Sequence, residues 1–431
     1  MNDLKKISQS FLTKYGIDSS CINSASVIDD FLDEMRKGLN GKDSSLPMLP
    51  AYIGIDKPLP FDTPVIVLDA GGTNLRACLV TFSNQGEIII KHLSKREMPG
   101  THETLSEAQF YDVFCDFLKP LIRLSDDIGF CFSYPVEITP EKDGKLLHWT
   151  KEIKVPDVVG KYIGKGLANS LAENGHPNKK IIILNDTVAT LLAGMAKGKQ
   201  HQYDGYIGFI LGTGTNTAYL ENNNNIGKIE LTEGVQAINV ESGGFKKSPR
   251  SKLDKQFDAS TNNPSQHIFE KMISGCYLGA IISTVIQTAA KDQLFSPSAK
   301  QFLEKILPLE TIDISRFIEN PHHPESPFKS NDFNDTDLTL LYYIINGYLK
   351  RAAKLTAINI ASAIIKSGTG KSPLHPICIN IDGSTYHKTA GFSLLTETYL
   401  VEILDPYDIF YRIIQVDNSP IIGAAIAGLI G

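Results

Sequence analysis

Several classes of protein are excluded by features that the sequence lacks. Its six cysteines form no CxxC pair and partly lie in apolar runs, so we expect buried reduced thiols and no disulfide framework. A net charge of −6 provides no broad basic face, which argues against nucleic acid or a membrane surface as a partner. The most apolar C-terminal stretch, residues 421–430, is about half of the ~20 residues that a membrane helix needs. Residues 1–17 contain no apolar signal segment, so we expect a cytoplasmic protein.

What is present is the composition of a folded globular chain. Hydrophobic residues make up 42% and charged residues 21%, which excludes a fibrous or largely disordered protein. At 431 residues the chain exceeds the size at which one hydrophobic core stops growing. We therefore expect two domains or lobes, with a small molecule bound between them.

From residue 64 onward, short β-branched runs alternate with longer amphipathic stretches, the pattern of an α/β protein. Strands are predicted at 65–68, 128–132, 181–184, 206–211 and 377–381. Helices are predicted at 187–197, 268–290 and 337–366, with an earlier helix capped by Ser26 and a last one starting at Ser419-Pro420. Residues 222–225 have the composition of a hairpin tip.

Several of the predicted strands end at a small polar cluster. The clusters are Asp69-Ala70-Gly71-Gly72, Ser133-Tyr134-Pro135, Asn185-Asp186, Gly212-Thr213-Gly214 and Asp382-Gly383-Ser384. Ligands of open α/β sheets bind outside strand ends, so we expect these clusters to meet in one crevice. Gly72-Thr73-Asn74 recurs as Gly214-Thr215-Asn216, each time between two β-like runs, which favours two related lobes.

Two glycine-containing turns are candidates for phosphate binding. The turn at 69–74 joins two apolar runs, and its glycines allow backbone N–H groups to approach an anion. No Gly-Lys-Ser/Thr follows it, so it is not a Walker A loop. Gly212-Thr213-Gly214 is a second turn of small residues, and two such turns suit one triphosphate. Taken alone, either turn is also explained as a plain hairpin.

A candidate base follows the strand at 181–184. Asp186 is predicted to lie at the strand end and at the N-cap of the next helix, where capping alone would also explain it. Phosphoryl transfer to a hydroxyl needs a group that accepts the hydroxyl proton, and a carboxylate within hydrogen-bond reach does this. We therefore expect Asp186 to be the base.

Two further polar groups suit a sugar or a phosphoryl group. Thr150 and Lys151 follow Trp149 and offer a hydroxyl and an ammonium together, although a solvated surface lysine is the usual alternative. Asn239 and Glu241, before a glycine pair, could bind ring hydroxyls or form an exposed turn.

Eight segments, taken in order, resemble the hexokinase family. They are LDAGGTNLRACLV (68–80), FCFSYP (130–135), WTK (149–151), NDTVATLLAG (185–194), GTGTNTAY (212–219), NVESGGF (239–245), FEKMISGCYLG (269–279) and IDGSTYHK (381–388). The C-terminal IIGAAIAGLI also resembles the family's closing helix. The resemblance implies an actin-like ATPase (ribonuclease H-like) fold, with two lobes that each contain a mixed sheet flanked by helices and a cleft between them.

The resemblance also implies a division of the chain and a reaction. Residues 1–61 would be an N-terminal helical segment on the large lobe, 62–184 the small lobe completed by a helix at 417–431, and 185–416 the large lobe. The substrates would be ATP with Mg²⁺ and a hexose, first of all glucose, phosphorylated at its 6-hydroxyl.

The resemblance assigns roles residue by residue. Asp186 would be the base and Lys151 a second catalytic residue that stabilises phosphate charge. The other residues that would hold sugar oxygens are Ser133, Thr150, Lys151, Asn185, Asn216 and Glu241. Asp69 would lie near the metal, through water, and Arg76 near the phosphates. The phosphate loops would be Gly71, Gly72, Thr73, Asn74, Gly212, Thr213 and Gly214, with Gly383 and Ser384 beside the adenosine.

Two departures from the family pattern concern sugar preference. Ala280 stands where the family usually has a glutamate at the anomeric end of the sugar, and Ser242 replaces a tryptophan. These changes keep a kinase for mannose, fructose or an N-acetylhexosamine open, as well as a sugar-sensing protein with little catalysis. An actin- or chaperone-like ATPase would not need WTK, FSYP and Asn185-Asp186 as a set. The sequence leaves the oligomeric state open.

Overall fold

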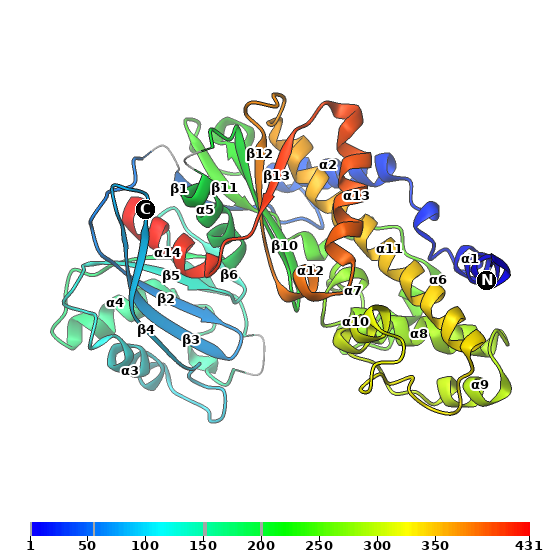
Figure 1. The fold of residues 1–431 in the computed structure, drawn as a ribbon. Helices are drawn as coiled ribbons and strands as arrows, with labels where there is room; N and C mark the ends of the chain where they lie inside the picture. Colours follow the sequence, from blue (N-terminus) through cyan, green and yellow to red (C-terminus); the bar gives the residue numbers. More distant parts are fainter. Residues whose placement is uncertain (1, 55–56, 150–152, 199–200) are drawn as a thin grey trace.

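The computed structural model describes residues 2–54, 57–149, 153–198 and 201–431, and these form two lobes (Figure 1). Each lobe is built on a mixed sheet with helices against it, which confirms the predicted α/β class. Among the described residues, no helix is both long and apolar enough to cross a membrane.

The small lobe contains a five-stranded sheet in the order β4-β3-β2-β5-β8. Its strands are β2 (Val65–Gly71), β3 (Asn74–Phe82), β4 (Ile88–Glu97), β5 (Asp127–Phe132) and β8 (Lys180–Leu184). The first three form antiparallel pairs, whereas β5 and β8 run parallel to β2. A small hairpin of β6 (Val136–Ile138) and β7 (Gly144–Leu146) lies beyond β5.

Both faces of this sheet are covered, which explains why β2 is apolar at almost every position. Ile66 and Leu68 share one core with α3 (Glu107–Leu118) and α4 (Ile163–Glu173). Val65 and Val67 point to the opposite face and share a second core with α5 (Asp186–Gly198) and α14 (Ser419–Ile430).

The large lobe contains a six-stranded sheet in the order β1-β11-β10-β9-β12-β13. Its strands are β1 (Leu49–Gly54), β9 (Gly205–Leu211), β10 (Thr215–Asn222), β11 (Val235–Asn239), β12 (Ile377–Asp382) and β13 (Tyr411–Ile414). Its other helices are α6 (Lys252–Ala259), α7 (Glu270–Ile273), α8 (Leu278–Lys291), α9 (Pro297–Glu304), α10 (Thr311–Glu319), α11 (Asp335–Ser367), α12 (Ser384–Lys388) and α13 (Phe392–Leu404).

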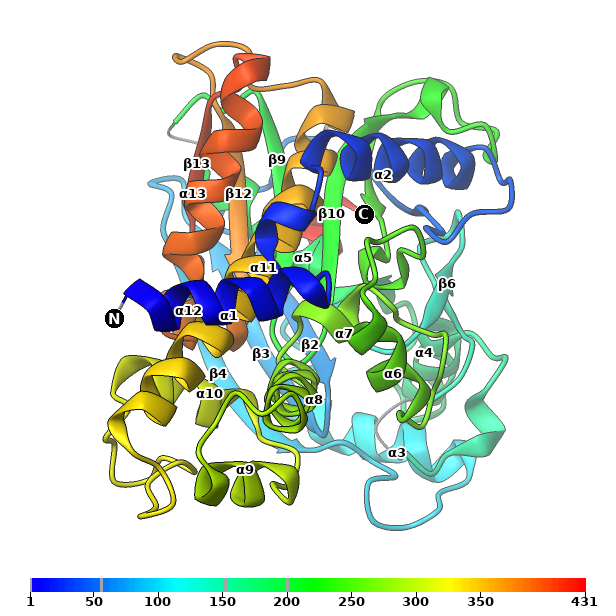
Figure 2. The same cartoon turned by 90° about the vertical axis from the view of Figure 1, so that its right-hand side faces the viewer.

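The N-terminal helices pack on the large lobe. α1 (Asn2–Lys14) and α2 (Ser24–Leu39) lie across α11 and contribute Leu12 and Phe31 to the large-lobe core (Figure 2). A Cβ at Gly347 of α11 would lie 2.2 Å from Leu12 Cδ1, so the glycine permits this crossing. The predicted boundaries at residues 61, 184 and 416 stay predictions.

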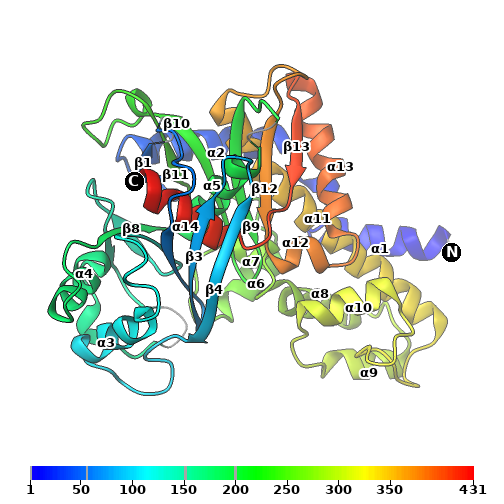
Figure 3. The same cartoon turned by 60° about the vertical axis from the view of Figure 1, so that its left-hand side comes forward.

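The C-terminal helix α14 connects the two sheets. It packs on β2, β5 and β8 of the small lobe and against α5, which in turn lies on β9 and β12 of the large lobe (Figure 3). A Cβ at Gly423 would lie 2.0 Å from the carbonyl oxygen of Ala189, so α14 and α5 cross with their backbones nearly in contact. The helix begins at Ser419-Pro420 as predicted, but its N-cap residue is Asn418 and not Ser419, which is the first helical residue. Close burial on nearly all sides explains why this helix is apolar throughout.

The structure differs from the expected elements in three places. The helix predicted at 268–290 is two helices, α7 and α8, because residues 274–277 leave the helix to bond the loop at Gly212. The cap of α2 is Asn23, whose side chain accepts from the backbone N–H of Ser26. Residues 223–225 are a short 3₁₀ turn at the start of the longer connection between β10 and β11.

Candidate active site between the lobes

Three parallel strands of the small lobe end side by side, as predicted, and bring the first group of site residues together. Asp69 and Gly71 end β2, Ser133 follows β5, and Asn185 with Asp186 follows β8. A Cβ at Gly71 would lie 3.7 Å from Ser133 Oγ and 3.8 Å from Asp69 Oδ1, so these positions border the same space. The pKa of the buried Cys131 thiol is raised mainly by burial and also by the charges of Asp69 and Asp186. Both carboxylates therefore face the end of β5.

The candidate base has a different local role from the one predicted. The side chain of Asn185, not that of Asp186, caps α5: its Oδ1 accepts from the backbone N–H of Thr187 at 2.8 Å. Asp186 is the first helical residue and is half-buried, and the Thr187 hydroxyl donates to its Oδ1 at 3.1 Å. The N-terminus of a helix favours the ionised form of a carboxyl group. Asp186 is therefore well placed to act as a carboxylate.

Asp69 is held by an arginine of the neighbouring strand. Arg76 pairs with Asp69 across β2 and β3, with Nε 2.7 Å and Nη2 2.6 Å from Asp69 Oδ2. Burial raises the pKa of Asp69, Arg76 opposes this shift, and the charge of Asp382 at the end of β12 adds to it. Asp382 belongs to the large lobe, so the charges of the two lobes act on each other at this point.

The turn at 71–74 joins β2 to β3 as the tip of a hairpin. Gly71 pairs with Asn74 in the antiparallel register, and Gly72 between them has φ +66. Thr73 is exposed, and its carbonyl accepts from the backbone N–H of Met98 at 2.9 Å. The Gly72 carbonyl also accepts from Tyr134 Oη at 2.5 Å, so the turn is fixed at the end of the sheet with Thr73 at its exposed tip.

In the large lobe, the second predicted turn meets the predicted adenosine-binding residues. Gly212 N–H donates to the Gly214 carbonyl at 2.9 Å, which closes the turn between β9 and β10 and leaves Thr213 exposed. Gly383, with φ +113, lies so close that a Cβ there would be 2.3 Å from the carbonyl carbon of Leu211. Ser384 is exposed beside it, at the start of α12.

The predicted sugar-binding residues of the large lobe form one hydrogen-bonded group. Asn216 Nδ2 donates to Asn239 Oδ1 at 2.7 Å, and Asn239 Nδ2 donates to Glu241 Oε1 at 2.7 Å. Glu241 has a left-handed backbone, φ +58 and ψ +45. Burial raises its pKa, Asn239 opposes the shift, and the charges of Asp186 and Glu270 add to it. The charge of Asp186, at the start of α5, therefore reaches Glu241.

Glu270 is a site residue that the sequence analysis missed. It begins α7, and its Oε2 accepts from the backbone N–H of Thr215 at 3.0 Å. A Cβ at Gly214 would lie 2.5 Å from the same oxygen, so the carboxylate covers the turn. Its only sequence signal was its place in FEKMISG. From the sequence, we expect a glutamate contact to be missing because position 280 is an alanine. Ala280 lies in α8 and packs against the large-lobe core. The carboxylate beside the second glycine turn comes instead from Glu270.

Two predicted residues, Thr150 and Lys151, lie outside the described residues. Their neighbour Trp149 is fixed: its Nε1–H donates to the Val155 carbonyl at 2.6 Å, and its ring lies edge-on to Tyr134 at 5.1 Å between centroids. Tyr134 in turn follows Ser133. The segment that continues into Thr150 therefore starts beside the small-lobe half of the site.

The described residues contain no cluster of three or more His, Cys, Asp or Glu that would hold a metal ion by themselves. Asp69 lies beside the turn at 71–74, where a Cβ at Gly71 would be 3.8 Å from its Oδ1, and its other oxygen, Oδ2, is bonded to Arg76. Mg²⁺ takes oxygen ligands, keeps several waters and needs only one or two protein carboxylates when phosphates supply the rest. The residues present fit a metal of this kind.

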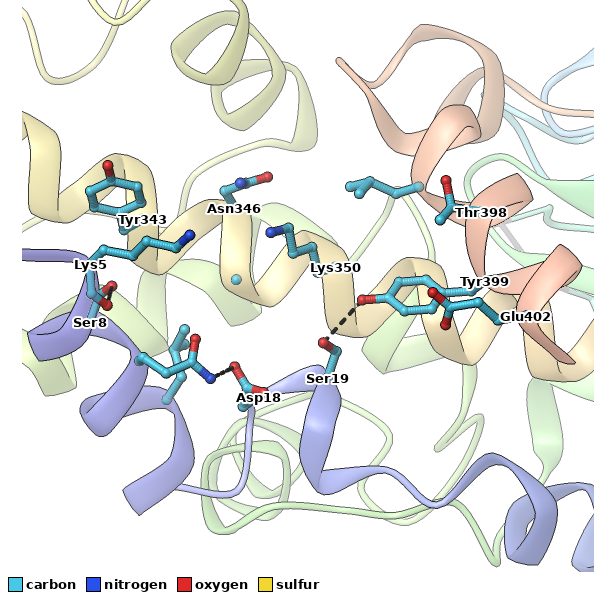
Figure 4. A pocket seen from close by; sticks show the side chains of 14 residues that line it. Lys5, Ser8, Asp18, Ser19, Tyr343, Asn346, Lys350, Thr398, Tyr399 and Glu402 are labelled. Carbon is cyan, nitrogen blue, oxygen red and sulfur yellow. Dashed lines mark hydrogen bonds between the residues drawn. The ribbon is translucent and has the colours of Figure 1, made fainter. Parts of the chain in front are cut away.

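A separate hollow of about 320 Å³ lies away from these residues, between α1, α11 and α13 (Figure 4). Each helix lines it with side chains spaced three or four residues apart, such as Lys5, Lys350 and Tyr399. Tyr399 Oη donates to Ser19 Oγ at 3.0 Å at its edge. None of the predicted site residues lines this hollow, so it is not the candidate active site.

Solved structures share the architecture. A hexokinase from Schistosoma mansoni complexed with glucose matches with a TM-score of 0.76 at 23% identity, covering 98% of this chain and 99% of that one. A second hexokinase crystal structure matches with a TM-score of 0.78 at 23% identity over the whole of both chains. The fold is thus that of the actin-like ATPases.

The sequence comparisons name the family. Models described as hexokinase match residues 9–196 and 206–430. Hexokinase-5 of Oryza sativa subsp. japonica is 30% identical over 88% of this chain and 80% of its own length. Glucokinase-1 of Kluyveromyces lactis is 30% identical over 93% of both chains. The chain belongs to the hexokinase family. It is a hexokinase, an enzyme that phosphorylates hexoses with ATP as co-substrate.

Proposed function

We propose that this hexokinase transfers the γ-phosphoryl group of ATP to the 6-hydroxyl of glucose, giving glucose 6-phosphate and ADP. The preference for glucose is supported by the likeness to a glucokinase and to a hexokinase solved with glucose. The cytoplasm stays the expected place of this reaction.

One observation carries the proposal: α5, which begins with Asp186, packs against β10 and β11, the strands that carry Asn216 and Asn239 and lead to Glu241. Asn216, Asn239 and Glu241 present amide and carboxylate groups that suit ring hydroxyls. A hexose bound to them would extend toward Asp186. The hydroxyl that reaches Asp186 is then the acceptor of the phosphoryl group.

Asp186 accepts the proton of that hydroxyl as the oxygen attacks the γ-phosphorus. Its position at the N-terminus of α5 favours the carboxylate form, and the Thr187 hydroxyl orients one of its oxygens. Asn185, fixed by its cap to Thr187, lies beside it and would bind a neighbouring sugar oxygen.

The two glycine turns would hold the phosphates from opposite lobes, with Gly71–Asn74 on one side and residues 212–214 on the other. Mg²⁺ would be held by the phosphates and, through water, by Asp69, and it supplies neutralisation of phosphate charge. Arg76 keeps Asp69 oriented and adds positive charge nearby. Lys151 stays predicted to stabilise the transferring phosphoryl group.

The test is a coupled assay of ADP release with ATP and Mg²⁺ on the wild-type protein. The sugars are glucose, mannose, fructose and N-acetylglucosamine at a range of concentrations, with a no-sugar control. Glucose is expected to give the highest kcat/KM, and a glucose-6-phosphate dehydrogenase should oxidise its product. A higher kcat/KM for another sugar, or ADP release that no sugar stimulates, would overturn the proposal.

A further inference from the structure

A closed ring of hydrogen bonds lies buried beneath the sugar-binding group of the large lobe. Thr217 Oγ1 donates to Asn359 Oδ1 at 3.0 Å, and Asn359 Nδ2 donates to Ser242 Oγ at 3.1 Å. Ser242 Oγ and Thr217 Oγ1 are 3.1 Å apart. Thr217 has a single hydroxyl hydrogen and gives it to Asn359, so Ser242 is the donor in the third bond. Each residue thus donates once and accepts once.

The three residues are cut off from water and come from distant parts of the chain. Thr217 and Ser242 have no exposed surface, and Asn359 is 2% exposed. Thr217 belongs to β10, Ser242 follows β11, and Asn359 lies in the middle of α11, which runs along β10 (Figure 2). A buried polar ring that is fully satisfied fixes the geometry of the elements it joins.

Two residues of the ring directly follow proposed sugar-binding residues in the sequence. Thr217 follows Asn216, and Ser242 follows Glu241. Asn216 Oδ1 also accepts from the backbone N–H groups of Thr217, at 2.7 Å, and of Ser242, at 3.3 Å. Together with the backbone bond from Val240 N–H to the Thr217 carbonyl, at 2.9 Å, the ring fixes the two backbones that carry Asn216 and Glu241 relative to each other.

Glu241 needs such support because of its backbone. Its left-handed conformation costs a non-glycine residue roughly 1–2 kcal/mol and persists only where the surroundings enforce it. The residue after it is fixed by its side chain to Thr217 and Asn359 and by its N–H to Asn216. Without the ring, the segment around Glu241 can relax and turn the carboxylate away.

We propose that Thr217, Ser242 and Asn359 are positioning residues that hold Asn216 and Glu241 in the arrangement that binds the hexose. This inference rests on the proposed function, since it takes the hexose as the ligand of Asn216 and Glu241. The three residues do not touch the substrate. They set its affinity by fixing the two side chains that do.

The key variants are T217V, which removes one hydroxyl at constant shape, and T217S, which keeps that hydroxyl. T217V is expected to raise the KM for hexose about tenfold, with KM for ATP unchanged and kcat little changed, the loss of roughly one buried hydrogen bond. T217S is expected to stay near wild type. S362A is the matched control: Ser362 is equally buried one turn further along α11, but its hydroxyl bonds only the Ile358 carbonyl.

The double variant T217V/S242A tests whether the ring acts as a unit. Its KM for hexose is expected to equal the higher of the KM values of T217V and S242A, because breaking the ring at one residue already removes its effect. An equal KM for hexose in T217V, T217S and wild type would overturn the proposal, as would a KM shift in S362A as large as in T217V. Failure of the proposed function shows separately, as wild-type protein that no hexose stimulates.

Discussion

Arg76 places two nitrogens within 2.7 Å of a single oxygen of Asp69, across the β2–β3 pair that carries the phosphate-type turn. The pair is mostly shielded from water, and burial pushes the pKa of Asp69 upward while Arg76 pulls it down. Arg76 is therefore the main group that keeps the pKa of Asp69 from rising further.

Removing the charge of Arg76 should narrow the pH range of activity. In R76M, burial of Asp69 loses its main opposing group, so the pKa of Asp69 rises further and the carboxylate protonates at higher pH. The acid limb of the kcat/KM profile is expected to move to higher pH, since the proposed role of Asp69 needs its ionised form. R76K, which retains the charge, should show a smaller shift. An acid limb that stays in place in R76M would show that Asp69 does not control activity.

Gly383 is expected to be a position where a single methyl group weakens ATP binding. In G383A the Cβ would lie 2.3 Å from the Leu211 carbonyl carbon and 2.7 Å from Gly212 N, so the second glycine turn must move. The KM for ATP should rise more than tenfold, the effect of a misplaced binding loop, with KM for hexose less affected. The control is G391A, which also has a positive φ, of +70, but open space around the added methyl. Equal KM values for ATP in the two variants would contradict this account.

The charge of Glu270 should matter for the hexose. E270Q retains an oxygen for the Thr215 N–H but loses the negative charge that raises the pKa of Glu241. The KM for hexose is expected to rise roughly tenfold to a hundredfold, in line with one hydrogen bond to a charged group. Glu304, exposed in α9, gives the control variant E304Q, which should behave as wild type. A KM in E270Q within the error of wild type would remove Glu270 from the site.

The stability of the large lobe should depend on a buried ion pair that is not among the candidate site residues. Arg351 of α11 and Asp254 of α6 are fully shielded, with Nη2 2.6 Å from Oδ2. Burial alone would raise the pKa of Asp254, but Arg351 and Ser251 outweigh it and hold that pKa below its ordinary value. The pair thus contributes stability at neutral pH that is lost as the pH falls through the lowered pKa.

In R351M, the uncompensated Asp254 should reduce the free energy of unfolding by about 3–5 kcal/mol. Its pKa then rises, so acidification to pH 5 should cost the variant less stability than it costs wild type. The double variant R351M/D254L is expected to recover most of the loss. Urea titrations at pH 7 and pH 5 measure both effects. Single and double variants that are equally unstable would show that the side-chain volumes, not the charges, stabilise this region.

Most of the fold could be predicted because local patterns determine it. The five predicted strands are all present, within three residues at their ends, because each is a short apolar run bounded by polar or glycine residues. α11 and α14 begin within two residues of their predicted starts. The break between α7 and α8 could not be predicted, since the apolar pattern continues through it. The helix is interrupted because the backbone N–H of Gly275 donates to the carbonyl of Gly212 at 2.8 Å, and Gly212 lies 63 positions earlier in the chain.

The site was predictable where its residues lie at strand ends, and less so elsewhere. Ser133, Asn185 and Asp186 follow apolar runs directly, which marks them in the sequence. Glu270 begins a four-residue helix after a loop and had no such signal. Asn359 could have been noticed as a polar residue within an apolar helix, but only the structure shows that it meets Thr217 and Ser242.

The measurement that tests the central claim most directly compares hexose binding with hexose turnover in D186N. The single tryptophan, Trp149, precedes Thr150 and Lys151, so its fluorescence is the expected reporter of glucose binding. We predict that D186N binds glucose within a few-fold of wild type but has a kcat lowered by about 10²–10⁴-fold, the contribution of a general base. A D186N variant that turns glucose over at the wild-type rate would contradict the assignment of Asp186 as the base.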